Sequence, residues 1–66
     1  MAYRVEYAIW AYGTERALSV VDADSDEVLA GPVDPFWPVG IPAEAKARRQ
    51  IIAARAAEMV RELRAS

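Results

Sequence analysis

The C-terminal third of the sequence constrains the fold most strongly. Residues 42–64 contain no Gly and no internal Pro, and Ala, Arg, Glu and Gln dominate them. Because these residues are strong helix formers, the segment predicts one long helix. Pro42 suits the first helical position, which places Glu44 in the first turn and in good order to pair with Arg48 one turn later. A helix of this length leaves only residues 1–41 for the rest of the fold.

One side of the predicted helix is apolar and is expected to pack on the other elements. At about 100° per residue, the positions that share this stripe are Ala45, Ile52, Ala56, Met59, Val60 and Leu63. A second side is rich in alanine and carries Ala47, Ile51 and Ala54. Small side chains permit close approach of another helix, so these three residues are candidates for self-association.

The N-terminal part has the pattern of three strands. Residues 2–12, 16–22 and 27–31 are rich in β-branched or apolar residues, and the first of these segments alternates clearly with a period of two. Gly13-Thr14 and Asp24-Ser25-Asp26 separate them, as is typical of turns. The odd positions of the first strand are expected to face the core: Tyr3, Val5, Tyr7, Ile9 and Ala11.

The predicted elements together indicate an α+β fold. We expect a single domain over residues 1–66, with a three-stranded antiparallel β-meander followed by one long C-terminal helix packed on the sheet (βββα). Such a short chain buries only about 60% of the surface that its unfolded form exposes. Since the sequence contains no Cys and no zinc pattern, oligomerisation is the remaining common way to support so thin a core.

A proline-rich loop, residues 32–41, joins the third strand to the helix and contains two adjacent aromatic rings. Phe36 and Trp37 either anchor a protein partner or fold back to complete the core. Trp10 cannot share a face with Ile9, so Trp10 and the nearby Tyr12 are either covered by a loop ring or form an exposed apolar patch. The candidate partner-binding residues are Trp10, Tyr12, Phe36 and Trp37.

Charge divides unevenly along the chain. Residues 1–41 contain two basic and seven acidic side chains, whereas residues 42–66 contain six basic and three acidic ones. The basic helix residues Lys46, Arg48, Arg49 and Arg55 give an alternative function, the binding of nucleic acid. Two observations weigh against it: the sequence pI is about 4.9, unlike the basic values of nucleic-acid-binding domains, and these side chains point in different directions around the helix.

Several kinds of chemistry are excluded or disfavoured. Without Cys or His, the chain has no thiolate or imidazole metal ligand and lacks the commonest general base. The segment from Asp22 to Asp26 begins like a calcium loop, but Glu27 stands where that loop requires Gly and Val33 where it requires Glu. An acidic hairpin turn is the simpler interpretation, and we expect no metal site and no cofactor.

The function expected from these features is a small non-enzymatic protein-interaction module, inhibitor- or adaptor-like. Its partner would be another protein, and the exposed aromatic residues would promote self-association into a homo-oligomer. No apolar run approaches the length of a membrane span, and the N-terminal residues do not resemble a secretory signal, so a cytoplasmic location is expected.

Overall fold

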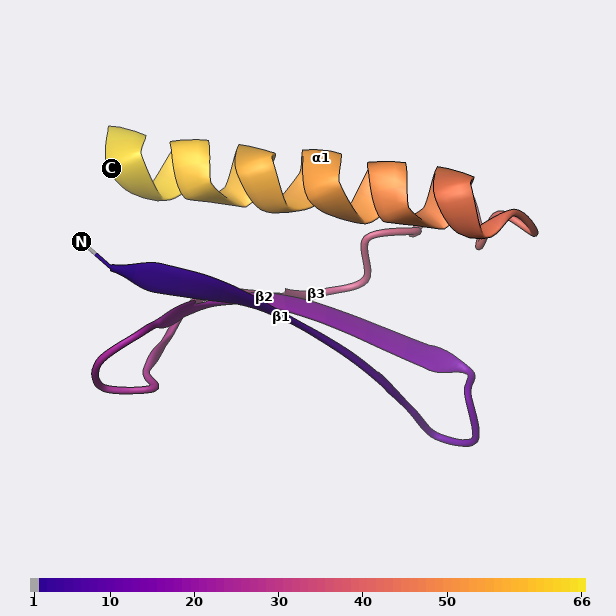
Figure 1. Ribbon diagram of the computed structural model, residues 1–66, viewed down its shortest axis with the longest axis horizontal. Coiled ribbons are helices and arrows are strands. Elements are labelled where there is room, and N and C mark those ends of the chain that lie inside the picture. Colours follow the sequence, from indigo (N-terminus) through magenta and orange to yellow (C-terminus); the bar gives the residue numbers. More distant parts are fainter. Residues whose placement is uncertain (1) are drawn as a thin grey trace.

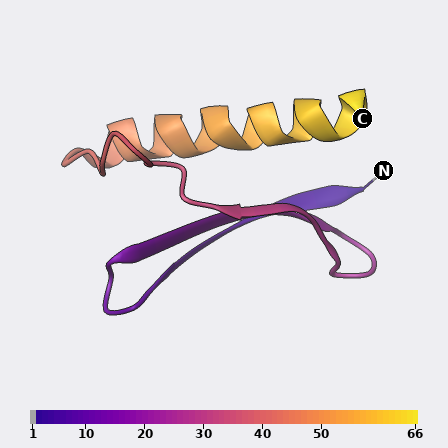
Figure 2. The same ribbon diagram turned by 180° about the vertical axis from the view of Figure 1, so that it is seen from behind.

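The computed structural model describes residues 2–66, which form one sheet and one helix (Figure 1 and, from behind, Figure 2). The strands β1 (Tyr3–Trp10), β2 (Glu15–Asp22) and β3 (Val28–Val33) form an antiparallel meander in the order β1-β2-β3. The helix α1 (Ala45–Ala65) lies across one face of the sheet. The predicted βββα arrangement is therefore confirmed.

The core lies between α1 and the strands β2 and β3. Leu18 and Val20 of β2 are fully buried, and Ala56, Met59 and Val60 of α1 pack against them. Around this cluster pack the partly buried Tyr7, Ala30, Val33, Ile52 and Leu63. Of the stripe predicted for the helix, only Ala45 is exposed, so helical periodicity identified the packed side.

The expectation that β1 continues to Tyr12 is wrong. Ala11 and Tyr12 have φ angles of 53° and 59°, and Gly13 follows at 84°. An extended strand cannot contain three consecutive left-handed residues, so the chain turns over residues 11–14. The amide of Thr14 donates to the Ala11 carbonyl oxygen at 3.2 Å and closes this turn. Tyr12 therefore lies at the tip of the β1–β2 hairpin instead of on a strand face.

β3 is longer than predicted, because it passes through Pro32 and ends at Val33. Proline has no amide hydrogen, which confines it to edge strands and bulges. β3 is an edge strand, and register shifts interrupt its pairing with β2. Gly31 lies so close to β2 that a β-carbon on it would stand 2.6 Å from the carbonyl oxygen of Leu18. Only glycine fits this position without a shift of the backbone.

The helix begins later than predicted. α1 starts at Ala45 with Glu44 as its N-cap residue, so Pro42 lies outside it. Glu44 makes no capping hydrogen bond with its side chain, and the first turn holds no acidic residue. Arg48 does not pair with Glu44 as predicted: its Nη1 donates to the carbonyl oxygens of Pro42 (2.9 Å) and Ala43 (2.7 Å).

The odd positions of β1 are on the face that α1 covers, but most of them are not buried. Val5 pairs in register with Val20, and Tyr7 with Leu18, so this row shares the face of the core. Even so, Tyr3, Val5 and Ile9 stay exposed, which corrects the expectation of a buried row. A helix is about 10 Å wide and strands are about 4.8 Å apart, so one helix covers about two strands. Here it covers β2 and β3.

Candidate functional site

The most exposed element of the sheet is the edge strand β1. Of its eight residues only Tyr7 is half-buried, and the other seven are exposed. β2 pairs with one side of β1, and no strand among residues 2–66 pairs with the other. Its outer edge therefore presents backbone N–H and C=O groups that are free to pair with another chain.

The hydrogen bonds to β2 identify which peptide groups of β1 face outward. The amide of Ala23 donates to the carbonyl oxygen of Ala2 at 3.1 Å, so Ala2 directs its peptide groups toward β2. In an antiparallel pair, this direction alternates from one residue to the next. The outward peptide groups therefore belong to the odd positions Tyr3, Val5, Tyr7 and Ile9.

The two edges of the sheet are protected to different degrees. β3 contains Pro32, Gly31 and two register shifts, features that discourage pairing with another strand. β1 contains neither Gly nor Pro and pairs with β2 in an unbroken register from Tyr3 to Trp10. Of the two edges, β1 is the one that can accept a further strand.

The two adjacent rings of the loop have different environments. Phe36 is 3% exposed, so it completes the fold and is not available to a partner, whereas Trp37 is 80% exposed. Two hydrogen bonds order the loop here: the amide of Phe36 donates to Oδ1 of Asp34 (2.9 Å), and the amide of Gly40 donates to the Phe36 carbonyl (2.7 Å). Phe36 is therefore part of the core, whereas Trp37 stays a candidate anchor for a protein partner.

Trp10 and Tyr12 lie close together in the chain, at the outer end of the β1–β2 hairpin. Trp10 is 59% exposed and Tyr12 is fully exposed, so no loop ring covers either of them. Figure 1 shows this end of the hairpin extending away from α1. A bulky residue in a left-handed conformation is uncommon, and such residues cluster at functional sites. The hairpin tip is therefore a second exposed aromatic feature beside the edge of β1.

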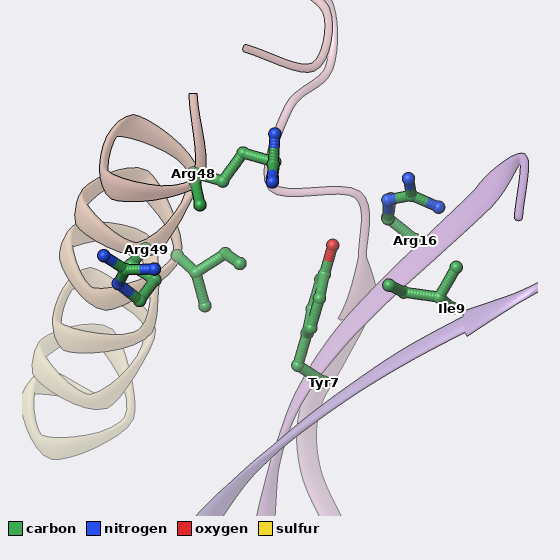
Figure 3. A pocket seen from close by; sticks show the side chains of 7 residues that line it. Tyr7, Ile9, Arg16, Arg48 and Arg49 are labelled. Atoms are coloured by element: carbon green, nitrogen blue, oxygen red, sulfur yellow. The ribbon is translucent and has the colours of Figure 1, made fainter. Parts of the chain in front are cut away.

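A hollow of about 300 Å³ separates β1 from the first half of α1 (Figure 3). We call it the arginine hollow, because Arg16, Arg48 and Arg49 line it together with Tyr7, Ile9 and Ile52. A smaller hollow of about 140 Å³ lies toward the other end of the helix and is lined by Tyr3, Val60, Leu63 and Arg64. There the Arg64 guanidinium lies over the Tyr3 ring, 5.9 Å from its centre.

The structure brings together only part of the basic set proposed for nucleic acid. Arg48 and Arg49 line the arginine hollow, but Arg55 pairs with Glu58 through Nη1 and Oε1 at 2.9 Å, and Lys46 is exposed outside the hollow. Arg16 of β2 lines the arginine hollow together with Arg48 and Arg49. The sequence alone did not group Arg16 with them, because it is far from them along the chain. The pairing of Ile9 with Arg16 across the hairpin is the signal that could have placed it.

The remaining candidates lie elsewhere on the surface. Of the helix residues proposed for self-association, Ile51 and Ala54 are exposed and Ala47 is half-buried. In the acidic turn, Oδ1 of Asp22 accepts hydrogen bonds from the amides of Asp24 (2.9 Å) and Ser25 (3.1 Å). The hydrogen bonds from Ser25 and Asp24 lower the pKa of Asp22. This carboxylate closes the turn, as the sequence interpretation expected.

Comparisons with known proteins assign no family to the chain. No protein-family model, no curated protein and no solved structure matches it. In the part of the chain that the structure describes, helical structure lacks the apolar length that a bilayer crossing requires. The function must therefore be argued from the surfaces themselves.

Proposed function

We propose that this chain is a small non-enzymatic protein-interaction module that self-associates, acting in the cytoplasm, and that a second copy pairs with the outer edge of β1. The observation that carries the proposal is the state of β1: an unbroken strand of eight residues, exposed on both faces, with one edge unpaired in residues 2–66. Strands of this kind are templates for a further strand, and proteins that do not use them usually protect them.

The side chains of β1 discriminate between possible registers. A twofold axis perpendicular to the sheet pairs residues that project from the same face. An axis at Glu6 would place two glutamates opposite each other, which is unfavourable. An axis at Val5 would pair Arg4 with Glu6 of the second copy, but it would leave Ile9 and Trp10, the most exposed apolar residues of β1, without a counterpart in the strand Tyr3–Trp10. The first register therefore has a like-charge pair at its centre, and the second leaves the most exposed apolar side chains of β1 uncovered.

An axis at Tyr7 avoids the pair of glutamates and gives both Ile9 and Trp10 a counterpart in the second copy. It pairs Val5 with Ile9 of the second copy, so that apolar side chains on the helix side cover one another. On the other face it sets Arg4 opposite Trp10, a cation and an aromatic ring that attract each other. The outward peptide groups of Val5, Tyr7 and Ile9 then meet those of the second copy in a continuous antiparallel ladder. We therefore assign this register to the dimer.

The experiment compares two lysine substitutions on opposite edges of the sheet. Val5 on β1 is 42% exposed and Val28 on β3 is 51% exposed, so Val5→Lys and Val28→Lys make the same change at similar positions. Sedimentation equilibrium over a hundredfold range of concentration measures the monomer–dimer equilibrium, and circular dichroism verifies folding. A lysine on an edge opposes pairing, so we expect Val5→Lys to raise the dimer Kd by at least about tenfold and Val28→Lys to leave it unchanged.

Three results would contradict the proposal. One is a wild-type chain that stays monomeric at the highest concentration tested. Another is an equal loss of dimer in Val5→Lys and Val28→Lys, because an interface on β1 cannot depend on a residue of the opposite edge. The third is a dimer that Ile51→Lys alone abolishes, because the Ala-rich side of α1 would then be the interface.

A further inference from the structure

We propose that the arginine hollow is a binding site for a phosphate monoester, a function separate from self-association. Three arginine residues, Arg16, Arg48 and Arg49, line one hollow of about 300 Å³, and no acidic residue lines it with them. Within residues 2–66 none of these three arginines forms an ion pair, whereas Arg4 pairs with Glu6 and Asp26, and Arg55 with Glu58.

This local excess of positive charge is unusual for the chain as a whole, which has a formal net charge of −2. Cations that share a partly enclosed space repel one another, and the repulsion is stronger there than in bulk water. A multiply charged anion in the hollow would convert this repulsion into attraction. The arrangement is therefore better suited to a bound anion than to solvent alone.

Neutral groups hold two of the arginines in place. Nη1 of Arg48 donates to the carbonyl oxygens of Pro42 and Ala43, and Nη1 of Arg16 donates to the carbonyl oxygen of Gly13 at 2.6 Å. Carbonyl oxygens orient a guanidinium without neutralising it, which leaves its charge and its other N–H groups for a ligand. Arg16 also has a buried Nε without a hydrogen-bond partner, and an unsatisfied buried donor is costly.

The Tyr7 hydroxyl adds a neutral donor to the same space. In Figure 3 the Tyr7 ring stands upright from β1, with its hydroxyl directed toward the guanidinium groups of Arg16 and Arg48. Ile9 and Ile52 supply apolar surface at the sides of the hollow. The lining therefore combines cationic and hydroxyl donors with a place for a small apolar group.

The start of α1 points to the same ligand. Ala45, the first residue of the helix, lines the hollow, and no side chain caps the first turn. The N-terminus of a helix carries partial positive charge and free amides, so acidic residues are favoured there and basic ones are not. This helix has no acidic residue in its first turn, and Lys46, Arg48 and Arg49 follow at once. A helix N-terminus that carries basic instead of acidic residues departs from the usual preference, and such departures are expected at functional sites.

Size and charge define the ligand class. Arginine binds phosphate through paired hydrogen bonds, and a phosphate monoester carries close to two negative charges at neutral pH. The volume is at the lower limit for small-molecule pockets, which suits a phosphate with a small apolar or aromatic group. We therefore assign the hollow to a small organic phosphate monoester.

The test is a titration of the ¹⁵N-labelled chain of residues 1–66, at constant ionic strength, with inorganic phosphate and then with phenyl phosphate. We expect saturable chemical-shift changes at the amides of the first turn of α1, and tighter binding of phenyl phosphate because of Ile9 and Ile52. Arg49→Ala is the principal variant, since Arg49 is exposed and its loss leaves the backbone contacts of Arg48 intact. The Kd of Arg49→Ala for phenyl phosphate should rise at least about tenfold relative to the wild type.

Arg61→Ala is the matched control, because it removes the same charge from an exposed position of α1 outside the hollow. It should change the Kd by less than about twofold, as expected for screened surface charge. The Val5→Lys variant should bind phosphate like the wild type, which separates this site from the dimer.

Three outcomes would overturn the assignment. Shifts that grow linearly without saturation would indicate an ionic-strength effect only. Equal losses of affinity in Arg49→Ala and Arg61→Ala would indicate attraction to the charge of the helix as a whole. Binding of a single-stranded oligonucleotide, without binding of either small phosphate, would assign the arginines to a polyanion instead.

Discussion

The contact between Gly31 and β2 gives the sharpest prediction about the fold. Gly31 has a φ of +92°, and a β-carbon there would lie 2.6 Å from the Leu18 carbonyl oxygen, 3.2 Å from the Ser19 Cα and 3.3 Å from the Met59 Cε. Gly31→Ala therefore strains the backbone, at about 1–2 kcal/mol, and forces neighbouring backbone to move, at about 1–3 kcal/mol more. We expect it to lower the free energy of unfolding by about 2–5 kcal/mol.

A loss of this size is large for so small a chain. At about 0.05–0.15 kcal/mol per residue, the whole fold is stable by about 3–10 kcal/mol. Gly13→Ala is the matched control, because Gly13 also has a positive φ, of +84°, but nothing within 4 Å of a β-carbon. It should cost only the backbone strain, about 1–2 kcal/mol, so the difference between the two variants isolates the close approach to β2.

Urea denaturation followed by far-UV circular dichroism measures both losses. All samples need the same low protein concentration, because self-association would stabilise the chain as concentration rises. If Gly31→Ala and Gly13→Ala lost the same free energy of unfolding, Gly31 of β3 would not lie against Leu18 of β2 and Met59 of α1, and the core geometry would be wrong.

Three further predictions concern the loop and the turns. Phe36→Ala should lower the free energy of unfolding by about 3 kcal/mol and Trp37→Ala by less than about 0.5 kcal/mol; similar losses in urea denaturation would contradict the assignment of only Phe36 to the interior. Tyr12→Asn should raise the melting temperature slightly, because asparagine tolerates the left-handed conformation better, and a lower value would count against strain at the tip. The lowered pKa of Asp22 means that its ionised form stabilises the fold above its ordinary pKa of about 4, and that this contribution is lost as the pH falls through the lowered value. Between pH 6 and about pH 2, the free energy of unfolding of Asp22→Asn should therefore fall less than that of the wild type. An equal fall in both would refute the stabilising role of the ionised Asp22 carboxylate.

Local patterns predicted the order and direction of the elements, because the helix and the strands each have their own periodicity. The buried stripe of α1 followed from spacing alone, with Met59 and Val60 at its centre. The exposure of Val5 and Ile9 did not, because alternation shows which face a residue is on and cannot show whether a helix covers that strand. Val5 and Ile9 are exposed because α1 lies over β2 and β3 and not over β1.

The candidate site was less predictable, since charged residues and loop rings carry no periodic signal. Arg48 and Arg49 were identified as basic helix residues, but their grouping with Arg16 depends on the hairpin register and on where the helix begins. Phe36 and Trp37 are adjacent and chemically similar, so composition could not decide which of them is buried. The backbone of the loop, held by Asp34, determines that choice.

Self-association through the outer edge of β1 is tested most directly by amide hydrogen exchange in β1, measured by NMR in a dilute and in a concentrated sample. The proposed dimer forms hydrogen bonds with the outward amides of Val5, Tyr7 and Ile9, while those of Glu6 and Ala8 already face β2. We predict that the three odd amides exchange rapidly in the dilute sample and slowly in the concentrated one, with the even amides protected in both. Odd amides that exchange equally fast at both concentrations would contradict self-association through this edge.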